Sequence, residues 1–223
     1  MKRFNFFLIS ISVVLFCMSG PAAAKEADLP DVTVDGLHRV PDSKMAIVYA
    51  EPGADLSQYK RINLLDAYVA FKKNWERDRR QGSISASRVT SKDMENIKNR
   101  LAQEFQTVFS KTLQDGGYDV VDESAEDVLL LRPAIINLDV NAPDTPRAGM
   151  TRTYASSAGE MTLYVELYDS VTGDLIAKAL DRRVDNQTFY TWTNSVTNKS
   201  AADKILAGWA KILLDALNEA KQP

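Results

Sequence analysis

The sequence predicts an α+β fold, a two-layer sandwich in which two long amphipathic helices pack on one face of a mixed, mostly antiparallel β-sheet. Apolar residues recur at helical spacing from Ser91 to Asp115 and again after Ala201, so each segment carries a stripe that must be buried. Gly159 to Tyr168 alternates apolar and polar residues with the period of a strand. A sheet with both helices on one side is the simplest arrangement that buries both stripes.

The first helix is expected over Ser91–Asp115. Thr90 or Ser91 can cap its start, and Asp93 follows Thr90 by three residues, as in a capping box. Gly116-Gly117 is expected to end it, because glycine adopts the left-handed closing conformation without a Cβ clash. The apolar stripe of this segment consists of Met94, Ile97, Leu101, Phe105, Val108, Phe109, Thr112 and Leu113.

The second helix is expected to begin near Ala201. Ser200 and Asp203 have the spacing of a capping box at this start. The residues that follow repeat at helical intervals, which predicts a second buried stripe. Its members are Ile205, Leu206, Trp209, Ile212, Leu213, Ala216 and Leu217.

The remaining regular segments are expected to be strands. Asp169–Asp174 contains Gly173, which tolerates a positive φ, and this turn predicts a hairpin. Pro133 removes a ladder donor from the run in which it lies, which predicts an edge position or a bulge there. In the segment Gly159–Tyr168, the polar face consists of Thr162, Tyr164, Glu166 and Tyr168. The expected strands are Met45–Ala50, Tyr59–Phe71, Tyr118–Asp122, Val128–Val140, Gly159–Tyr168 and Leu175–Val184.

The first 24 residues have the pattern of a secretory signal peptide. Lys2 and Arg3 precede a short apolar run, and the segment ends in Ala22-Ala23-Ala24. Cleavage is therefore expected between Ala24 and Lys25. After removal of residues 1–24, we expect a flexible N-terminal arm over residues 25–36 and a single α+β domain over residues 37–220.

Cys17 is the only cysteine, and it lies inside this leader. The expected outcome is that it is discarded, so that the exported chain has no disulfide and no thiol nucleophile. The alternative is a lipid anchor on Cys17. Lipidation requires small residues before the cysteine, whereas Leu15 and Phe16 precede this one.

Composition excludes several classes of function. Loss of Lys2 and Arg3 takes the formal net charge from −3 to −5, so no general attraction to nucleic acid is expected. No later apolar run is long enough to span a membrane. His38 is the only histidine, which argues against a Ser–His–Asp triad and a multi-histidine zinc site. The chain lacks the common phosphate-, dinucleotide- and zinc-binding motifs, so we expect no cofactor and no metal site.

Two segments are candidate partner-binding surfaces. Lys72–Thr90 is expected to be a long surface loop whose basic part contains Trp75, Arg77, Arg79 and Arg80, and it can bind an anionic polymer or an acidic partner. The alternative is a solvated loop with Trp75 folded onto the body. Phe189, Tyr190 and Trp192 form the second candidate, because exposed aromatic residues mark interaction sites. Their alternative is packing over the edge of the sheet.

Many carboxylates lie near turns and strand ends, where Asp and Asn also favour turn geometry. A pair of them facing a cleft at about 5–10 Å would permit glycoside hydrolysis. This pattern is the basis of the hydrolase alternative below. The residues concerned are Asp119, Asp122, Glu123, Glu126, Asp127, Asp139, Glu160, Glu166, Asp169 and Asp181.

Six short segments follow one another in a fixed order, namely Ser57-Gln-Tyr59, Gly116-Gly117-Tyr118, Asp127–Ile135, Ala158-Gly159-Glu160, Glu166–Gly173 and Asp181-Arg182-Arg183. In this order they resemble a family of bacterial exported proteins known as domain of unknown function thirty-three thirteen. The resemblance extends from about Gly36 to Leu217, and it implies a location in the Gram-negative cell envelope. Members of that family are often lipoproteins, and this chain departs from them in the apolar setting of Cys17. The family supplies no catalytic residues.

The sequence therefore predicts a non-catalytic periplasmic protein that binds an unknown envelope protein or an anionic polymer. The first alternative is a carboxylate-dependent hydrolase of an envelope polymer. The second is a structural subunit of an envelope assembly, which the expected edge strand around Pro133 suggests. The sequence does not indicate an oligomeric state.

Overall fold

One eight-stranded sheet organises the part of the chain that the computed structural model describes, which is residues 29–82, 89–140, 154–155, 159–184, 191–192 and 195–220. The chain divides into two compact units, Met1–Pro30 and Asp31–Pro223, and every element below lies in the second. The strands of the sheet are β1 (His38–Arg39), β2 (Ile47–Ala50), β3 (Arg61–Leu64), β4 (Tyr68–Phe71), β5 (Asp119–Val121), β6 (Val128–Val140), β8 (Gly159–Asp169) and β9 (Leu175–Val184).

The order of the strands confirms the prediction of a mixed sheet. It is β1-β2-β9-β8-β6-β3-β5, and β4 also pairs with β6. The four pairs β1–β2, β2–β9, β9–β8 and β8–β6 are antiparallel. Strands β3 and β4 run parallel to β6, and β5 runs parallel to β3. A separate two-stranded sheet pairs β7 (Tyr154–Ala155) with β10 (Thr191–Trp192).

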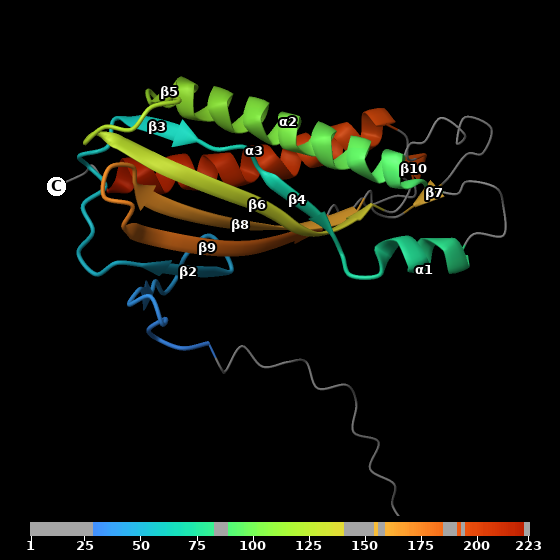
Figure 1. The fold of residues 1–223 in the computed structure, drawn as a ribbon, viewed down its shortest axis with the longest axis horizontal. Helices are drawn as coiled ribbons and strands as arrows, with labels where there is room; N and C mark the ends of the chain where they lie inside the picture. The colour runs from blue at the N-terminus through green and yellow to red at the C-terminus, as the bar shows by residue number, and fades with distance from the viewer. Residues whose placement is uncertain are drawn as a thin grey trace, which may run out of the picture. The chain divides into compact units, whose positions relative to one another are not determined.

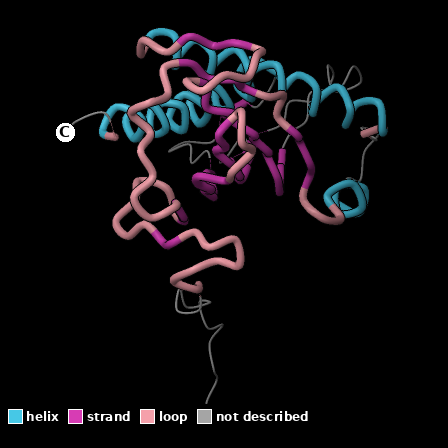
Figure 2. The backbone as a smooth tube through the Cα atoms, turned by 60° about the vertical axis from the view of Figure 1, so that its left-hand side comes forward, coloured by secondary structure: helices cyan, strands magenta, loops and turns pink. Residues whose placement is uncertain are grey.

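Two long helices pack together on one face of this sheet, α2 (Ser91–Asp115) and α3 (Ser195–Glu219) (Figures 1 and 2). Their buried side chains join those of the strands in one core, so the predicted two-layer sandwich is confirmed. The rings of Phe105 and Phe109 stack at a centroid distance of 3.9 Å inside this layer. The helix residues of the core are Leu101, Phe105, Phe109, Leu113, Leu206, Trp209, Ala210 and Leu217.

Helix α2 begins and ends as predicted. Thr90 Oγ1 accepts a hydrogen bond from the Asp93 amide at 3.2 Å, and Asp93 Oδ2 accepts one from the Thr90 amide at 2.9 Å. These two contacts form the expected capping box. Gly116 caps the helix, and Gly117 after it takes a φ of 86°, a conformation that glycine adopts without strain.

The predicted start of the second long helix is wrong, because α3 begins at Ser195 rather than near Ala201. Residues 195–200 contain no proline or glycine, so nothing in their sequence stops the helix from extending. Asp203, which the sequence assigns to a capping box, instead pairs with Lys199 at 3.0 Å. Lys199 also contacts Glu104 of α2 at 2.6 Å, so the additional turns of α3 are joined to α2.

The segment Tyr59–Phe71 is not one strand, as predicted, but the two strands β3 and β4. Both lie along the same edge of β6, and Leu65 donates its amide to Leu131 O at 3.0 Å where β3 ends. In a parallel ladder, the next hydrogen bond would run from the amide of residue 133 in β6 to the carbonyl oxygen of Leu65. Pro133 has no such amide, so the ladder stops and resumes only at Tyr68.

Pro133 therefore does not mark an edge strand, since β6 lies between β8 and the pair β3 and β4. The bulge lies elsewhere, between Ile136 and Asp139, where Asn137 takes a φ of 52°. The expected edge strand at Pro133 was the basis for a structural subunit of an assembly, and that basis is lost.

The expected loop Lys72–Thr90 contains a short helix, α1 (Trp75–Gly82). Its sequence has few apolar residues, which is why no helical stripe is visible in it. The helix is fixed at its start, where Trp75 packs against Phe71 of β4. None of the helices in the described ranges combines the length and the apolarity that a bilayer crossing requires.

Candidate functional site

The structure places Trp75, a predicted partner contact, against the body of the protein. Its side chain is only 4% exposed. The ring stacks on Phe71 with centroids 4.4 Å apart, and Nε1 donates to Asp139 Oδ1 at 3.0 Å. These contacts match the alternative in which Trp75 folds onto the body, and they leave this side chain little surface for a partner.

The other predicted contact residues are only partly described. Arg77 is exposed on α1 and pairs with its neighbour Asp78 at 3.2 Å. Arg79 and Arg80 lie in α1, and Trp192 lies in β10, but their side chains are outside the described part of the chain. Phe189 and Tyr190 lie wholly outside it, as do Ala24 and Lys25 at the expected cleavage site. The two predicted surfaces therefore remain predictions.

A polar cluster lies instead on the face of the sheet opposite α2 and α3, called the open face below. Glu166 of β8 is directed to this face, yet it is only 8% exposed. Tyr164 Oη donates to Glu166 Oε1 at 2.6 Å, and Tyr168 Oη donates to Oε2 at 2.9 Å. Arg132 of β6, directly opposite Glu166, forms an ion pair with Oε2 through Nε at 3.0 Å. These four residues are the Glu166 cluster.

Both tyrosines of the Glu166 cluster are fixed as hydrogen-bond donors. Burial raises the pKa of the Tyr164 phenol, and the hydrogen bond to Glu166 raises it further. Burial also raises the pKa of Tyr168, again with a contribution from Glu166. Because the unperturbed phenol pKa is already near 10, both groups are protonated at neutral pH.

Glu166 binds Arg132 through Nε, which leaves the terminal nitrogens of the guanidinium group outside this contact. Its Cζ lies 5.8 Å from the centre of the Tyr168 ring, within the range of a cation–π contact. The side chain nevertheless remains 61% exposed. Within the described residues, its terminal nitrogens Nη1 and Nη2 form no hydrogen bond. A planar pair of free donors of this kind matches the two oxygens of a carboxylate.

A second arginine lies on the same face. Arg182 of β9 is opposite Thr162 of β8 and pairs with Glu160. The arginine side chain is 59% exposed and the glutamate side chain only 21%. Tyr68 of β4 lies next to Arg132 along this face, opposite Ala134, and is 67% exposed. The exposed side chains of the open face thus include Arg132, Arg182 and Tyr68.

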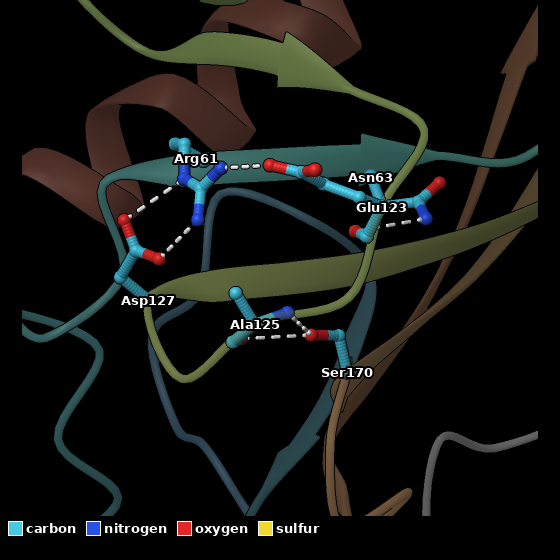
Figure 3. Close-up of polar contacts among 6 residues, drawn as sticks. All are labelled: Arg61, Asn63, Glu123, Ala125, Asp127 and Ser170. Carbon is cyan, nitrogen blue, oxygen red and sulfur yellow. Dashed lines mark hydrogen bonds and ion pairs between the residues drawn. The ribbon is translucent and has the colours of Figure 1, made fainter.

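Arg61, at the start of β3, is a contrasting arginine (Figure 3). Its Nε and Nη2 donate to the two carboxylate oxygens of Asp127 at 3.0 and 2.6 Å, and Nη1 contacts Glu123. The hydrogen bonds to Asp127 and Glu123 raise the pKa of Arg61, and the bond to Arg61 lowers the pKa of Asp127. All three guanidinium nitrogens are occupied, so this arginine connects β3 to the segment before β6.

Neighbouring contacts complete this second cluster. Asn63 Nδ2 donates to Glu123 O at 3.4 Å. Ser170, in the turn between β8 and β9, accepts from the Ala125 amide at 3.1 Å and donates to Ala125 O at 3.0 Å (Figure 3). The cluster therefore joins the hairpin turn to the segment between β5 and β6, and its role is structural.

The two buried carboxylates of the described chain lie on opposite faces of the sheet. Asp181 is opposite Leu163 and faces the helices, whereas Glu166 is opposite Lys178 on the open face. The sheet separates them, so they cannot act together on one bond. Among the described residues, no group of three or more His, Cys, Asp or Glu is placed to hold a metal ion.

Comparison with known proteins identifies a family. The family model described as "Protein of unknown function (DUF3313)" matches residues 32–213. A comparison with curated protein sequences found no match.

Solved structures give further likenesses. The PelC dodecamer from Paraburkholderia phytofirmans aligns with a TM-score of 0.40 and 13% identity, covering 75% of this chain and 96% of that one. A minor lipoprotein from Acinetobacter baumannii aligns with a TM-score of 0.37 and 13% identity, covering 74% and 97%. A DUF4136 family protein from Bacteroides thetaiotaomicron aligns with a TM-score of 0.34 and 9% identity, covering 74% and 95%.

Proposed function

We propose that this chain, which belongs to the family described as "Protein of unknown function (DUF3313)", is an exported protein of the bacterial cell envelope. In this proposal it binds a partner on the open face of its sheet and catalyses no reaction. The observation that carries the proposal is the exposed, unshared end of Arg132 beside the exposed ring of Tyr68.

Export is supported by the first 24 residues. Two basic residues, a short apolar run and three alanines follow one another as in a secretory signal peptide. The resemblance noted from the sequence implies the same location. The body that remains contains no cysteine, which suits an oxidising compartment.

Partner binding is supported by the composition and the order of the open face. Tyrosine and arginine, together with tryptophan, are enriched among the residues that dominate binding energy in protein interfaces. The Glu166 cluster fixes Arg132 and Tyr168 before a partner arrives, since Glu166 takes two hydrogen bonds and an ion pair. Fewer rotamers then have to be frozen on binding, which lowers its entropic cost.

The absence of catalysis is a proposal that rests on the placement of the carboxylates. Glu166 is surrounded by two phenols and an arginine, and Asp181 lies beneath Trp209 on the other face. Neither faces a second carboxylate across a space in which a substrate could bind.

One observation favours the hydrolase alternative. Asp139 and Glu160 are directly opposite each other across β6 and β8, at the distance of a cross-strand pair. Both are occupied by cations, since Lys72 lies 3.5 Å from Asp139 and 3.8 Å from Glu160. Incubation with purified cell-wall sacculi tests this alternative. Soluble fragments released by the wild type, but not by Asp139→Asn, would support it.

The proposed binding can be tested in intact cells with a photoreactive amino acid. We expect position 68 on the open face to give a covalent adduct, and position 103, exposed on α2, to give none. The adduct should also disappear when Arg132→Ala is added. Adducts of equal yield from both positions, no adduct from position 68, or an adduct insensitive to Arg132→Ala would each contradict the proposal.

A further inference from the structure

We infer that the partner is a protein whose docking segment carries carboxylates, and that Arg132 and Arg182 bind them. This inference rests on the proposed function and deepens it, because it assigns a chemistry to the ligand of the open face. It follows from the hydrogen bonds and ion pairs of the two arginines, from the charges around them and from the apolar side chains on the same face.

Arg132 is preorganised to bind a carboxylate. Its Nε is engaged by Glu166 at 3.0 Å and its Cζ lies 5.8 Å from the Tyr168 ring, so the guanidinium plane is held from two sides. The two terminal nitrogens are the donors that remain, and they have the spacing of a bidentate carboxylate contact. Arg61 shows that an arginine of this sheet can hold both oxygens of a carboxylate, there through Nε and Nη2 and not through the two terminal nitrogens.

The carboxylates paired with Arg132 and Arg182 are less exposed than these two arginines. The side chains of Glu166 and Glu160 are 11% and 21% exposed, against 61% and 59% for their partners Arg132 and Arg182. Lys72 adds a further cation that is 52% exposed.

One carboxylate on this face is more open. Asp35 is 44% exposed, and it is paired with Lys178. An approaching ligand therefore meets mainly positive charge, although the body as a whole is acidic.

The register of the strands sets the spacing of the two arginines. Arg132 is opposite Glu166, whereas Arg182 is opposite Thr162, four residues along β8 and two strands away from β6. Standard strand dimensions place their Cα atoms about 16 Å apart, which about five residues of extended chain would span. Because only residues an even number of positions apart share one side of an extended chain, the expected segment has two acidic residues about four positions apart.

Apolar side chains on the same face favour a polypeptide over an acidic polysaccharide. Leu130, Ile136 and Leu180 are opposite Tyr168, Thr162 and Tyr164 in the ladders, and all three are only half-buried. Burial of this aliphatic surface stabilises a complex only when the ligand supplies apolar atoms. A peptide with aliphatic residues between its carboxylates supplies both kinds of contact.

A random peptide display library tests this inference with the purified exported protein. We expect the enriched peptides to contain at least two Asp or Glu residues at the stated spacing, with aliphatic residues between them. Arg132→Met and Arg182→Met should each weaken binding of a synthetic enriched peptide by about tenfold or more, as expected for loss of a charged hydrogen bond. Arg100→Met, an exposed arginine of α2, is the matched control and should change nothing.

Each outcome is decisive. Enriched peptides without acidic residues, no enrichment, or binding that is indifferent to both arginine variants would overturn the inference. The inference would also be overturned if acidic peptides did not bind while polygalacturonate or phosphatidylglycerol vesicles bound in a way that depends on Arg132. If position 68 still gives its Arg132-dependent adduct in cells, the proposed function survives and only the assigned chemistry fails. If that adduct is absent as well, both fail.

Discussion

Trp209 of α3 donates its indole N–H to Oδ2 of Asp181 on β9, at 2.7 Å, between the helix layer and the sheet. Asp181 also accepts from the Ala46 amide at 3.1 Å and from Arg183 Nε at 2.7 Å. One buried carboxylate therefore fixes α3, the segment before β2 and β9 to one another. Trp209 and Asp181 are 1% and 6% exposed, so water cannot replace a lost partner.

Trp209→Phe is expected to destabilise the protein strongly. The substitution removes a donor from a buried carboxylate and leaves a gap in the core, and together these should cost about 2 kcal/mol or more of unfolding free energy. Urea unfolding followed by circular dichroism measures the change. Asp115→Asn, which breaks the exposed pair of Lys111 and Asp115, is the control and should cost less than about 0.5 kcal/mol. Equal effects of the two substitutions would show that the contact with Asp181 is not important.

Stability should fall in alkaline solution through Tyr59. Burial raises the pKa of this phenol to about 12, and its hydrogen bond to Asp169 adds to the effect. The unfolded phenol titrates near 10, so the stabilisation is complete below pH 10 and is lost between about pH 10 and 12. Melting temperatures between pH 8 and 12 should show this loss, and Tyr59→Phe should reduce it. A pH profile that Tyr59→Phe leaves unchanged would contradict the assignment.

The elements with a local signal were predictable from the sequence. The stripe and caps of α2 lie within one segment, and the structure gives the predicted bounds Ser91–Asp115. The bounds of β6 and β9 were also predicted, because a strand of ten or more residues has a long alternating or apolar pattern.

Features that depend on distant residues were not predictable. The split between β3 and β4 follows from Pro133, which is far along the chain from Leu65. Helix α1 has no apolar stripe of its own, and its position depends on contacts of Trp75 with Phe71 and Asp139. A single sequence shows no such pairing.

The open face was predicted only in part. Alternation along β8 correctly groups Tyr164, Glu166 and Tyr168 on one face of the strand. It treats that face as solvated, whereas Glu166 is buried by its two neighbours and by Arg132 from the adjacent strand. A tyrosine two residues before and another two residues after a glutamate was the available local signal, since side chains at i±2 share a face.

Gly159→Ala is expected to weaken the end of the sheet where β6 and β8 meet. A Cβ on Gly159 would lie 2.2 Å from the carbonyl oxygen of Asp139, and φ is +155° there. The backbone must move, at a cost of about 1–3 kcal/mol. Gly173→Ala is the matched control, since Gly173 has a φ of +76° but a Cβ added there would meet no atom within 4 Å. Urea unfolding should show the larger loss for Gly159→Ala, and the reverse order would contradict the clash.

If the chain is exported as proposed, its mature form is expected to begin at Lys25. Cleavage after Ala24 removes Cys17, so the intact mass of protein purified from the envelope should equal that of residues 25–223, with no reactive thiol. The same measurement distinguishes the alternative, because acylation of Cys17 would leave a chain that begins at that cysteine and carries added lipid mass. Retention of residues 1–24 would exclude both.

Arg61 and Arg132 should separate stability from binding. Arg61→Met leaves Asp127 and Glu123 without the cation that connects them to β3, so the free energy of unfolding should fall measurably. The adduct formed from position 68 in cells should be unaffected at temperatures where the variant is folded.

Arg132→Met should leave stability nearly unchanged and abolish binding, the opposite of Arg61→Met. Glu166 keeps both of its tyrosine donors, so stability should change by less than about 1 kcal/mol, while the adduct is lost. A variant at Arg132 that unfolds as readily as the Arg61 variant would mean that this arginine supports the sheet. Loss of the adduct would then report only unfolding. Binding at the open face would have to be tested with Arg132→Lys, which keeps the charge but not the planar pair of donors. A folded Arg132→Lys protein that still forms the full adduct would show that the paired donors of Arg132 are not what the partner binds.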